Sequence, residues 1–231
     1  AGTVGTLPLA PPGVEPSGKF HIEGEEPERS LQLGEYEAGL GKPRESIKLV
    51  QIDSNIRAIG NRTHQDHTGA IEKWGTQFLS NSKRHLVNGV ILKKGSPSCG
   101  LERVRVYPNQ EKGAMPKRDG RGLFAKQLTE CFPDLATTEE GWLNDGNLKE
   151  RFLVHVFTDF RFQKACNTGQ TKALIEFHAA HKFLFMAYDP MGQKKLGRIL
   201  AQAGRTEWEQ LINAYRAEMC QVFKKFPNRG R

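Results

Sequence analysis

Cysteine is scarce in this 231-residue chain, and the residues of this type are widely scattered. The four are Cys99, Cys131, Cys166 and Cys220, and no two of them form a C-x-x-C pair. This scatter excludes the dense disulfide framework of small secreted domains and the closely spaced thiols of common zinc motifs. A reducing cytoplasm is therefore the expected location, and there an isolated cysteine is usually a small core residue.

Long apolar runs are also missing. No stretch approaches the roughly 20 residues that a membrane-spanning helix needs, so we expect no membrane partner. Hydrophobic residues make up 37% of the chain and charged residues 26%, a balance typical of globular proteins. The net charge of +8 permits an anionic partner such as RNA or a nucleotide, although a merely charged surface explains it equally well.

The distribution of residue types divides the chain into three parts. Residues 1–36 are rich in Gly, Pro and Glu without a sustained apolar period, so we expect poor order there. Residues 37–166 mix strand and helix patterns, which predicts an α/β domain with a small parallel or mixed sheet and flanking helices. Residues 167–231 are helical in pattern and predict a short all-α domain.

Strand patterns in the second part are short. "IKLVQI" and "IRAIG" flank the turn-forming "DSN" and predict a hairpin. "HTGAIEKWGTQFLSN" predicts an amphipathic helix, and "VNGVILKKG" predicts a following strand that is covered on both faces. A strand after a helix after a strand implies a right-handed crossover and parallel pairing. "ERVRVY" alternates and predicts one more strand.

Helix patterns dominate the rest of the chain. The glycine-rich "RDGRG" leads into a helix whose inner side would carry Cys131. Asp145–Cys166 predicts a long amphipathic helix that closes the α/β domain. Two more helices are expected, over Thr171–Tyr188 and from the capping box that begins at Thr206 to Phe223.

The loop "GSPSCG", residues 95–100, is the first candidate site. Loops at the carboxyl ends of parallel strands are where open α/β sheets bind ligands. The thiol of Cys99 stands near Lys93 and Lys94, and neighbouring cations favour the thiolate that binds metals or attacks electrophiles. From the residues alone, a proline-containing turn with an incidental cysteine explains the motif equally well.

Several blocks resemble a bacterial family of unknown-function domains whose characterised members are thiouracil desulfidases. These blocks are "YEAGLGKPRESIKLV", "VNGVILKKGSPSCGLERVRVY", "GRGLFAKQL" and "EEGWLNDGNLKERFLVHVF", in the family's order over roughly residues 36 to 160. The resemblance implies a small α/β domain that removes sulfur from thiolated pyrimidine bases such as 2-thiouracil. It also implies a [4Fe-4S] cluster held by three cysteines, with one iron left open to accept the sulfur.

The resemblance assigns roles to particular residues. Cys99 corresponds to a cluster ligand, and Ser96 is the candidate for hydrogen bonding or proton transfer at the substrate, with Ser98 beside it. The candidate substrate-binding residues around this loop are Arg44, Glu45 and Lys94, although a surface ion pair explains Arg44 and Glu45 as well. The family's two other cysteine blocks do not occur here. We therefore expect little or no desulfidase activity from this chain alone.

The segment "LIEFHAAHKFLFMAYDPMGQKKLGRILA" is similar to a YbgA-type helical domain, a second uncharacterised family. Its His-x-x-His-Lys pattern falls on His178, His181 and Lys182. At i and i+3 the two imidazoles share one side of a helix and could bind a metal, an anion or a nucleobase. Two histidines do not close a metal site, and helix-surface histidines bonded to their neighbours are more common. Family members continue further, so we expect this domain to be incomplete.

Three functions fit these patterns. The leading one is a sulfur-removing enzyme of thiolated nucleobases, nucleotides or tRNA-derived thionucleosides, impaired by the missing cysteines. The second is a non-catalytic RNA- or nucleotide-binding protein that uses the basic residues and the loops "GSPSCG" and "RDGRG". The third is a truncated gene product without activity. The small helical part is expected to pack on the first domain or on a second copy in a homo-oligomer.

Overall fold

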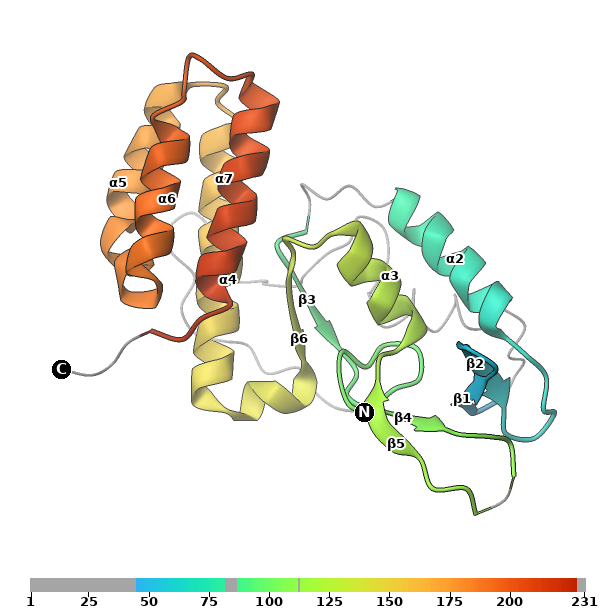
Figure 1. The fold of residues 1–231 in the computed structure, drawn as a ribbon. Coiled ribbons are helices and arrows are strands. Elements are labelled where there is room, and N and C mark those ends of the chain that lie inside the picture. The colour runs from blue at the N-terminus through green and yellow to red at the C-terminus, as the bar shows by residue number, and fades with distance from the viewer. Residues whose placement is uncertain (1–44, 82–86, 112, 228–231) are drawn as a thin grey trace, which may run out of the picture.

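The computed structural model describes residues 45–81, 87–111 and 113–227 and has a mixed α/β part followed by a helical part (Figure 1). The strands are β1 (Ile47–Ile52), β2 (Asn55–Gly60), β3 (Gly89–Leu92), β4 (Val104–Tyr107), β5 (Lys117–Gly120) and β6 (Ala136–Glu139). The helices are α2 (Thr68–Asn81), α3 (Leu123–Cys131), η3 (Glu140–Asn144, a 3-10 helix), α4 (Gly146–Cys166), α5 (Thr171–Tyr188), α6 (Pro190–Leu200) and α7 (Trp208–Phe223). The predicted fold class is confirmed.

The larger sheet has four strands in the order β2-β1-β4-β5. β1 and β2 form the predicted antiparallel hairpin, in which Ile52 pairs with Asn55 across a turn that places Asp53 at φ 53°. β4 runs parallel to β1, and β5 is antiparallel to β4. One face of this sheet packs against α2 and α3 in a small apolar core, in which Leu49 and Val106 of the sheet cluster with Ile71 of α2 and with Leu123 of α3.

The smaller sheet contains β3 and β6, which pair in parallel over four residues each (Figure 1). The predicted crossover that joins β3 to the hairpin sheet is therefore wrong, because β4 takes the parallel position beside β1. The expectation that β3 is covered on both faces is also wrong. Val90 and Leu92 pack in an apolar cluster with α2 and α3, whereas the Ile91 side chain between them is 44% exposed.

β5, β6 and α6 were not predicted from the sequence. β5 has the sequence "KRDG", whose charged residues and glycine give no apolar alternation. β6, "ATTE", pairs with a strand far away in the sequence. α6 begins with Pro190 after Asp189, whose side chain accepts a hydrogen bond from the Met191 amide. An acidic N-cap followed by proline is a recognisable helix start, so α6 was predictable.

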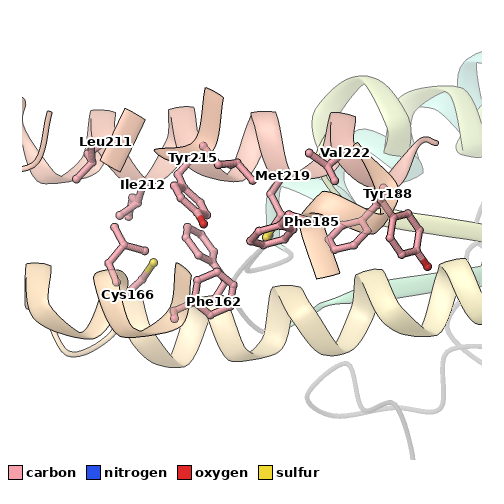
Figure 2. Close-up of a cluster of buried hydrophobic side chains, with 13 residues drawn as sticks. Phe162, Cys166, Phe185, Tyr188, Leu211, Ile212, Tyr215, Met219 and Val222 are labelled. Carbon is pink, nitrogen blue, oxygen red and sulfur yellow. The ribbon is translucent and has the colours of Figure 1, made fainter. Parts of the chain in front are cut away.

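α4 takes part in the cores of both parts of the chain. Near its beginning, Phe152 and Val156 pack on Ala136 of β6. Near its end, Phe162 and Cys166 belong to the largest apolar cluster, which they form with α5, α6 and α7. Figure 2 shows these two side chains facing Tyr215 and its neighbours on α7. The rings of Phe162 and Tyr215 stack with centroids 5.3 Å apart.

A buried ionic network also joins the two parts. Arg216 of α7 lies with its Nε 3.4 Å from Oδ1 of Asp159 on α4 and 3.6 Å from Oδ2 of Asp134, which follows α3. The second oxygen of Asp159 accepts hydrogen bonds from the side-chain amides of Asn88, just before β3, and of Gln163. The carboxylate of Asp159 is 1% exposed, so charge pairing and hydrogen bonds must offset the cost of burying it.

Two details of the helices correct the sequence expectations. Cys131 ends α3 and is exposed, because the helix turns its Leu123, Phe124 and Leu128 inward instead. α7 begins at Trp208 rather than at the predicted capping box, and its N-cap residue makes no side-chain cap. On α5 the apolar residues Leu174, Phe177, Phe185 and Tyr188 are all buried.

Across the described ranges, each helix is too short or too polar to pass through a lipid bilayer.

Candidate functional site

The loop after β3 folds into a tight turn that the hydroxyl of Ser96 stabilises. Ser96 Oγ accepts hydrogen bonds from the backbone amides of Ser98 and Cys99, each at 3.3 Å. The Gly100 amide donates to the Ser96 carbonyl at 2.9 Å, and Gly95 has φ +66°, a conformation that favours glycine. The structure thus gives Ser96 a role in forming the turn.

The same turn caps α3. The N-cap residue of this helix makes no side-chain hydrogen bond, so its first amides need other acceptors. The Pro97 carbonyl accepts from the Leu123 amide at 3.1 Å. The Ser98 carbonyl accepts from the amides of Phe124 and Ala125 at 2.9 and 3.1 Å. Backbone carbonyls of the turn therefore replace a capping side chain.

Gly122 lets the two glycine-rich motifs of the sequence contact each other. Its amide donates to the Gly100 carbonyl at 2.7 Å. A Cβ atom at Gly122 would lie 2.5 Å from the carbonyl carbon and oxygen of Ser98 and 2.6 Å from the Cys99 nitrogen. A residue with a side chain does not fit this approach, so "GSPSCG" and "RDGRG" form one unit.

Cys99 lies inside this unit, in the apolar cluster beneath the turn. It is 7% exposed and belongs to a cluster with Leu92 of β3, Leu101 just after the turn and Phe124 of α3. Ser98 beside it is 3% exposed. The loop therefore buries both predicted site residues rather than presenting them at the surface.

A pocket of about 440 Å³ opens beside the turn, where the carboxyl ends of the parallel strands β3 and β6 meet β4 and β5. It is lined by Lys94, Gly95, Glu102, Arg103, Arg105, Arg118, Glu139 and Trp142. Four of these side chains are cationic and two are acidic. The carboxylate of Glu139 already accepts a hydrogen bond from the Leu101 amide at 2.8 Å. The pocket is therefore basic, with one aromatic wall.

Two of the pocket arginines lie directly opposite each other. Arg105 of β4 pairs with Arg118 of β5 in the antiparallel register, so their side chains leave the same face of the sheet. Like charges in this position are destabilising, and an anion between them removes the penalty. Arg103 adds a third guanidinium two residues before Arg105, with its own backbone at φ 56°.

The basic end of the β3 loop is partly neutralised by Glu140. Its carboxylate accepts a hydrogen bond from the Lys94 amide at 2.6 Å and lies 3.1 Å from Lys93 Nζ. Burial alone would raise the pKa of Glu140, but these two contacts outweigh it and hold the pKa below its ordinary value. Lys93 therefore forms an ion pair with Glu140, whereas Lys94 lines the pocket.

Glu45, a predicted substrate-binding residue, instead holds the loop after β2. Its Oε1 accepts hydrogen bonds from the Arg62 and Thr63 amides, both at 2.7 Å, and its Oε2 accepts from the Thr63 hydroxyl at 2.7 Å. These hydrogen bonds, first among them the Thr63 amide, lower the pKa of Glu45 from 4.5 to about 2. Arg44, predicted beside it, lies outside the described residues.

This pKa predicts a specific loss of stability in acid. A carboxyl group with a depressed pKa in the folded state stabilises the fold above its unfolded pKa of 4.5 and loses that contribution as the pH falls towards 2. We expect the unfolding free energy of the Glu45→Gln variant to fall less steeply between pH 5 and 2 than that of the wild type. Urea unfolding across this range measures the difference. Glu176→Gln, on the exposed side of α5, is the control and should keep the wild-type slope; an unchanged slope in Glu45→Gln would refute the assignment.

The predicted histidine pair lies on α5, which Figure 1 shows on the opposite side of α4 from β3. His178 Nδ1 is 2.8 Å from the Tyr215 hydroxyl, and His181 Nδ1 is 2.8 Å from the Phe177 carbonyl. Burial lowers the pKa of both imidazoles, and the charge of Lys182 lowers that of His178 further. Each ring is thus hydrogen-bonded to its neighbours, and the pair is separate from the pocket.

Sequence reasoning missed most of the pocket residues. Of the predicted residues only Lys94 lines the pocket, and Arg103, Arg105 and Arg118 are not among the predicted site residues. One signal was available: alternation in "ERVRVY" places Arg103 and Arg105 on the same face of the strand. The pairing with Arg118 and the position of Trp142 depend on contacts between segments far apart in the sequence, so no local pattern indicates them.

The residues present do not fit the [4Fe-4S] cluster that the resemblance implies. All four cysteines of the sequence are among the described residues, and Cys99 alone lies near the turn. Cys131 is exposed at the end of α3, and Cys166 and Cys220 are buried on α4 and α7. Within residues 45–81, 87–111 and 113–227, no three His, Cys, Asp or Glu side chains are placed to hold a metal ion.

Comparison with known protein families gives two matches. Residues 34–140 match the family described as 2-thiouracil desulfurase, and residues 182–231 match a protein family of unknown function, DUF1722. The matches confirm the expected fusion of a desulfurase-like segment to a YbgA-like segment. The first contains the β3 turn and every pocket residue except Trp142. Comparison with curated proteins and with solved structures gave no match.

Proposed function

We propose that this chain, which joins a desulfurase-like segment to a DUF1722 segment, binds a thiolated pyrimidine nucleobase or its nucleotide in the basic pocket beside the β3 turn. The family match supports a sulfur-related function for residues 34–140. The observation that carries the proposal is the opposed pair Arg105 and Arg118 in a pocket with an aromatic wall. Guanidinium groups donate to phosphate or to a base carbonyl, and Trp142 offers a face for stacking.

The chemical role of the chain follows from what its residues can do. The arginines and Lys94 neutralise and orient an anionic ligand, and the two carboxylates of the pocket can accept hydrogen bonds from a base N–H or a ribose hydroxyl. Since the cysteines do not fit a cluster, no sulfur-transfer step is assigned to this chain alone. We place the protein in the bacterial cytoplasm, with a thiolated nucleobase or nucleotide as ligand and a second copy as a further partner.

Ligand titration tests the proposal. We expect 2-thiouridine 5′-monophosphate to bind the wild type, and Arg105→Ala and Arg118→Ala each to weaken binding by about tenfold, because each removes a charge-assisted hydrogen bond. Isothermal titration calorimetry measures the dissociation constants, with Lys172→Ala on the exposed side of α5 as the control. No binding by the wild type at millimolar ligand, or equal affinity in all variants, would contradict the proposal.

The cluster gives a second, independent prediction. After anaerobic reconstitution with iron and sulfide, followed by desalting, we expect well under one iron per chain and no absorption band near 400 nm. The physical reason is that a cubane held by one thiolate exchanges its iron and sulfide with solvent. Iron is measured colorimetrically against protein concentration. About four irons per chain would contradict the prediction and show that this chain, alone or with a second copy, holds a cluster.

A non-catalytic RNA-binding function is the second candidate, favoured by the same basic pocket and by the net charge of +8. RNA binding through phosphates weakens steeply with salt because counterions are released. A tRNA affinity that falls by more than tenfold between 50 and 200 mM salt, combined with no response to 2-thiouridine 5′-monophosphate, would favour this function over the first.

A further inference from the structure

The segments that follow β3 and β6 meet at the edge of the basic pocket. The two strands pair in parallel with Leu92 opposite Glu139. The same register, continued beyond the strand ends, places Lys94 opposite Gly141. Glu140 fixes the backbone here, because its carboxylate accepts a hydrogen bond from the Lys94 amide at 2.6 Å. The point from which the Lys94 side chain leaves is therefore held beside the segment that follows β6.

The side chain of Lys94 lies directly against Gly141. A Cβ atom at Gly141 would meet the Cδ of Lys94 at 2.8 Å, its Nζ at 3.5 Å and its Cε at 3.7 Å. Successive atoms of the lysine side chain thus occupy the space that the glycine leaves free. Lys94 and Trp142, the residue after Gly141, both line the pocket. This contact therefore lies at the edge of the pocket.

The charge of Lys94 is available to a ligand. Glu140 forms its ion pair with Lys93 instead, with Oε1 3.1 Å from Nζ. Among residues 45–81, 87–111 and 113–227, no carboxylate forms an ion pair with Lys94. A lysine side chain loses conformational entropy when it binds an anion, so a surface that already holds the side chain in place lowers the cost of binding.

We propose that Gly141 is a positioning residue of the basic pocket, which holds the Lys94 ammonium group where it contacts the phosphate of the ligand. This inference rests on the proposed function, since it requires that the pocket binds a thiolated pyrimidine nucleotide. The backbone of Gly141 lies outside the positive-φ region that only glycine favours. A methyl group at this position meets a flexible side chain and no backbone atom within 4 Å. Gly141→Ala should therefore leave the fold intact and displace the ammonium group.

Ligand titration of the full chain tests this role. We expect Lys94→Ala and Gly141→Ala each to weaken the binding of 2-thiouridine 5′-monophosphate about fivefold, which is the upper range for an exposed ion pair. Because Gly141 acts through Lys94, the double variant should bind as weakly as Lys94→Ala alone. 2-Thiouridine, which lacks the phosphate, should bind to all three variants as it does to the wild type. Isothermal titration calorimetry measures the dissociation constants.

Gly146→Ala is the matched control, because a Cβ atom at Gly146 meets nothing within 4 Å. It should keep the wild-type affinity for the nucleotide. Thermal unfolding verifies that the fold is intact: the melting temperature of Gly141→Ala should lie within about 2 °C of the wild type, as for other surface substitutions.

The outcomes separate this inference from the proposed function. A wild type that does not bind the nucleotide would contradict the proposed function, and the role of Gly141 with it. Nucleotide binding by the wild type with unchanged affinity in Lys94→Ala or in Gly141→Ala would overturn the positioning role alone. Additive losses in the double variant, or a matching loss of 2-thiouridine affinity in Gly141→Ala, would show that this substitution alters the pocket without Lys94, which also overturns the role.

Discussion

Replacing Gly122 by alanine should destabilise the protein by about 3 kcal/mol, near the upper end of what overpacking usually costs. The added methyl group would lie 2.5 Å from the carbonyl carbon and oxygen of Ser98. These are backbone atoms that also cap the first turn of α3, so they cannot move away without breaking hydrogen bonds to Phe124 and Ala125. Thermal unfolding should show a melting temperature lower by about 6–12 °C.

Gly69→Ala is the matched control for this change. A Cβ atom at Gly69 meets nothing within 4 Å, and the residue lies in α2, where alanine is the better helix former. We therefore expect its unfolding free energy to be unchanged or raised by less than about 1 kcal/mol. If Gly122→Ala were as stable as Gly69→Ala, the close contact between the two glycine motifs would be disproved.

Removing the charge of Arg216 should lower the stability of the protein about as much as Gly122→Ala does. In Arg216→Met the buried carboxylate of Asp159 loses the guanidinium of Arg216, and breaking a buried pair from one side typically costs about 3 kcal/mol or more. Asn88 and Gln163 still donate hydrogen bonds to Asp159, but they do not neutralise it. Urea unfolding measures the loss as a lower midpoint with an unchanged slope.

A double-mutant cycle separates this pairing from packing. Combining Arg216→Met with Asp159→Asn removes both charges, so the double variant should be more stable than the sum of the single losses predicts, by at least about 1 kcal/mol. Lys172→Met breaks the exposed pair with Glu176, whose atoms are 3.9 Å apart, and should change stability by less than about 0.5 kcal/mol. If the two single losses of stability added up to the loss in the double variant, Arg216 would stabilise the packing of α7 on α4 through its contact with the Phe162 ring instead.

Local patterns predicted the elements that depend on local periodicity. The hairpin of β1 and β2 and the helices α2, α4 and α5 follow from alternation, helical spacing and turn residues within each segment. The pairing of strands from separate segments did not follow, since it is decided by contacts between residues far apart in the sequence. β4 rather than β3 lies beside β1, and β6, whose "ATTE" sequence has little apolar character, is the partner of β3.

The loop beside the pocket was predicted from the sequence, but most residues that line the pocket were not. The glycine-flanked motif after β3 correctly indicated a loop at the carboxyl end of a parallel strand, and the pocket lies beside it. Two predicted site residues of that motif stabilise the loop instead. The Ser96 hydroxyl accepts a backbone hydrogen bond within the turn, and Cys99 packs in the apolar cluster beneath it. The pocket charges come from β4 and β5, whose opposed register no single segment encodes.

The sharing of α4 has a consequence for how this protein can be divided. Because Phe152 and Phe162 belong to different apolar clusters on one continuous helix, a cut after Cys166 leaves the cluster of Phe152 whole but removes Phe162 and Cys166 from the interior of the helical part. A chimera that exchanges only the last three helices would have to match the foreign surface to Phe162 and Cys166. Inheriting the DUF1722 segment as a module therefore requires inheriting the second half of α4 with it.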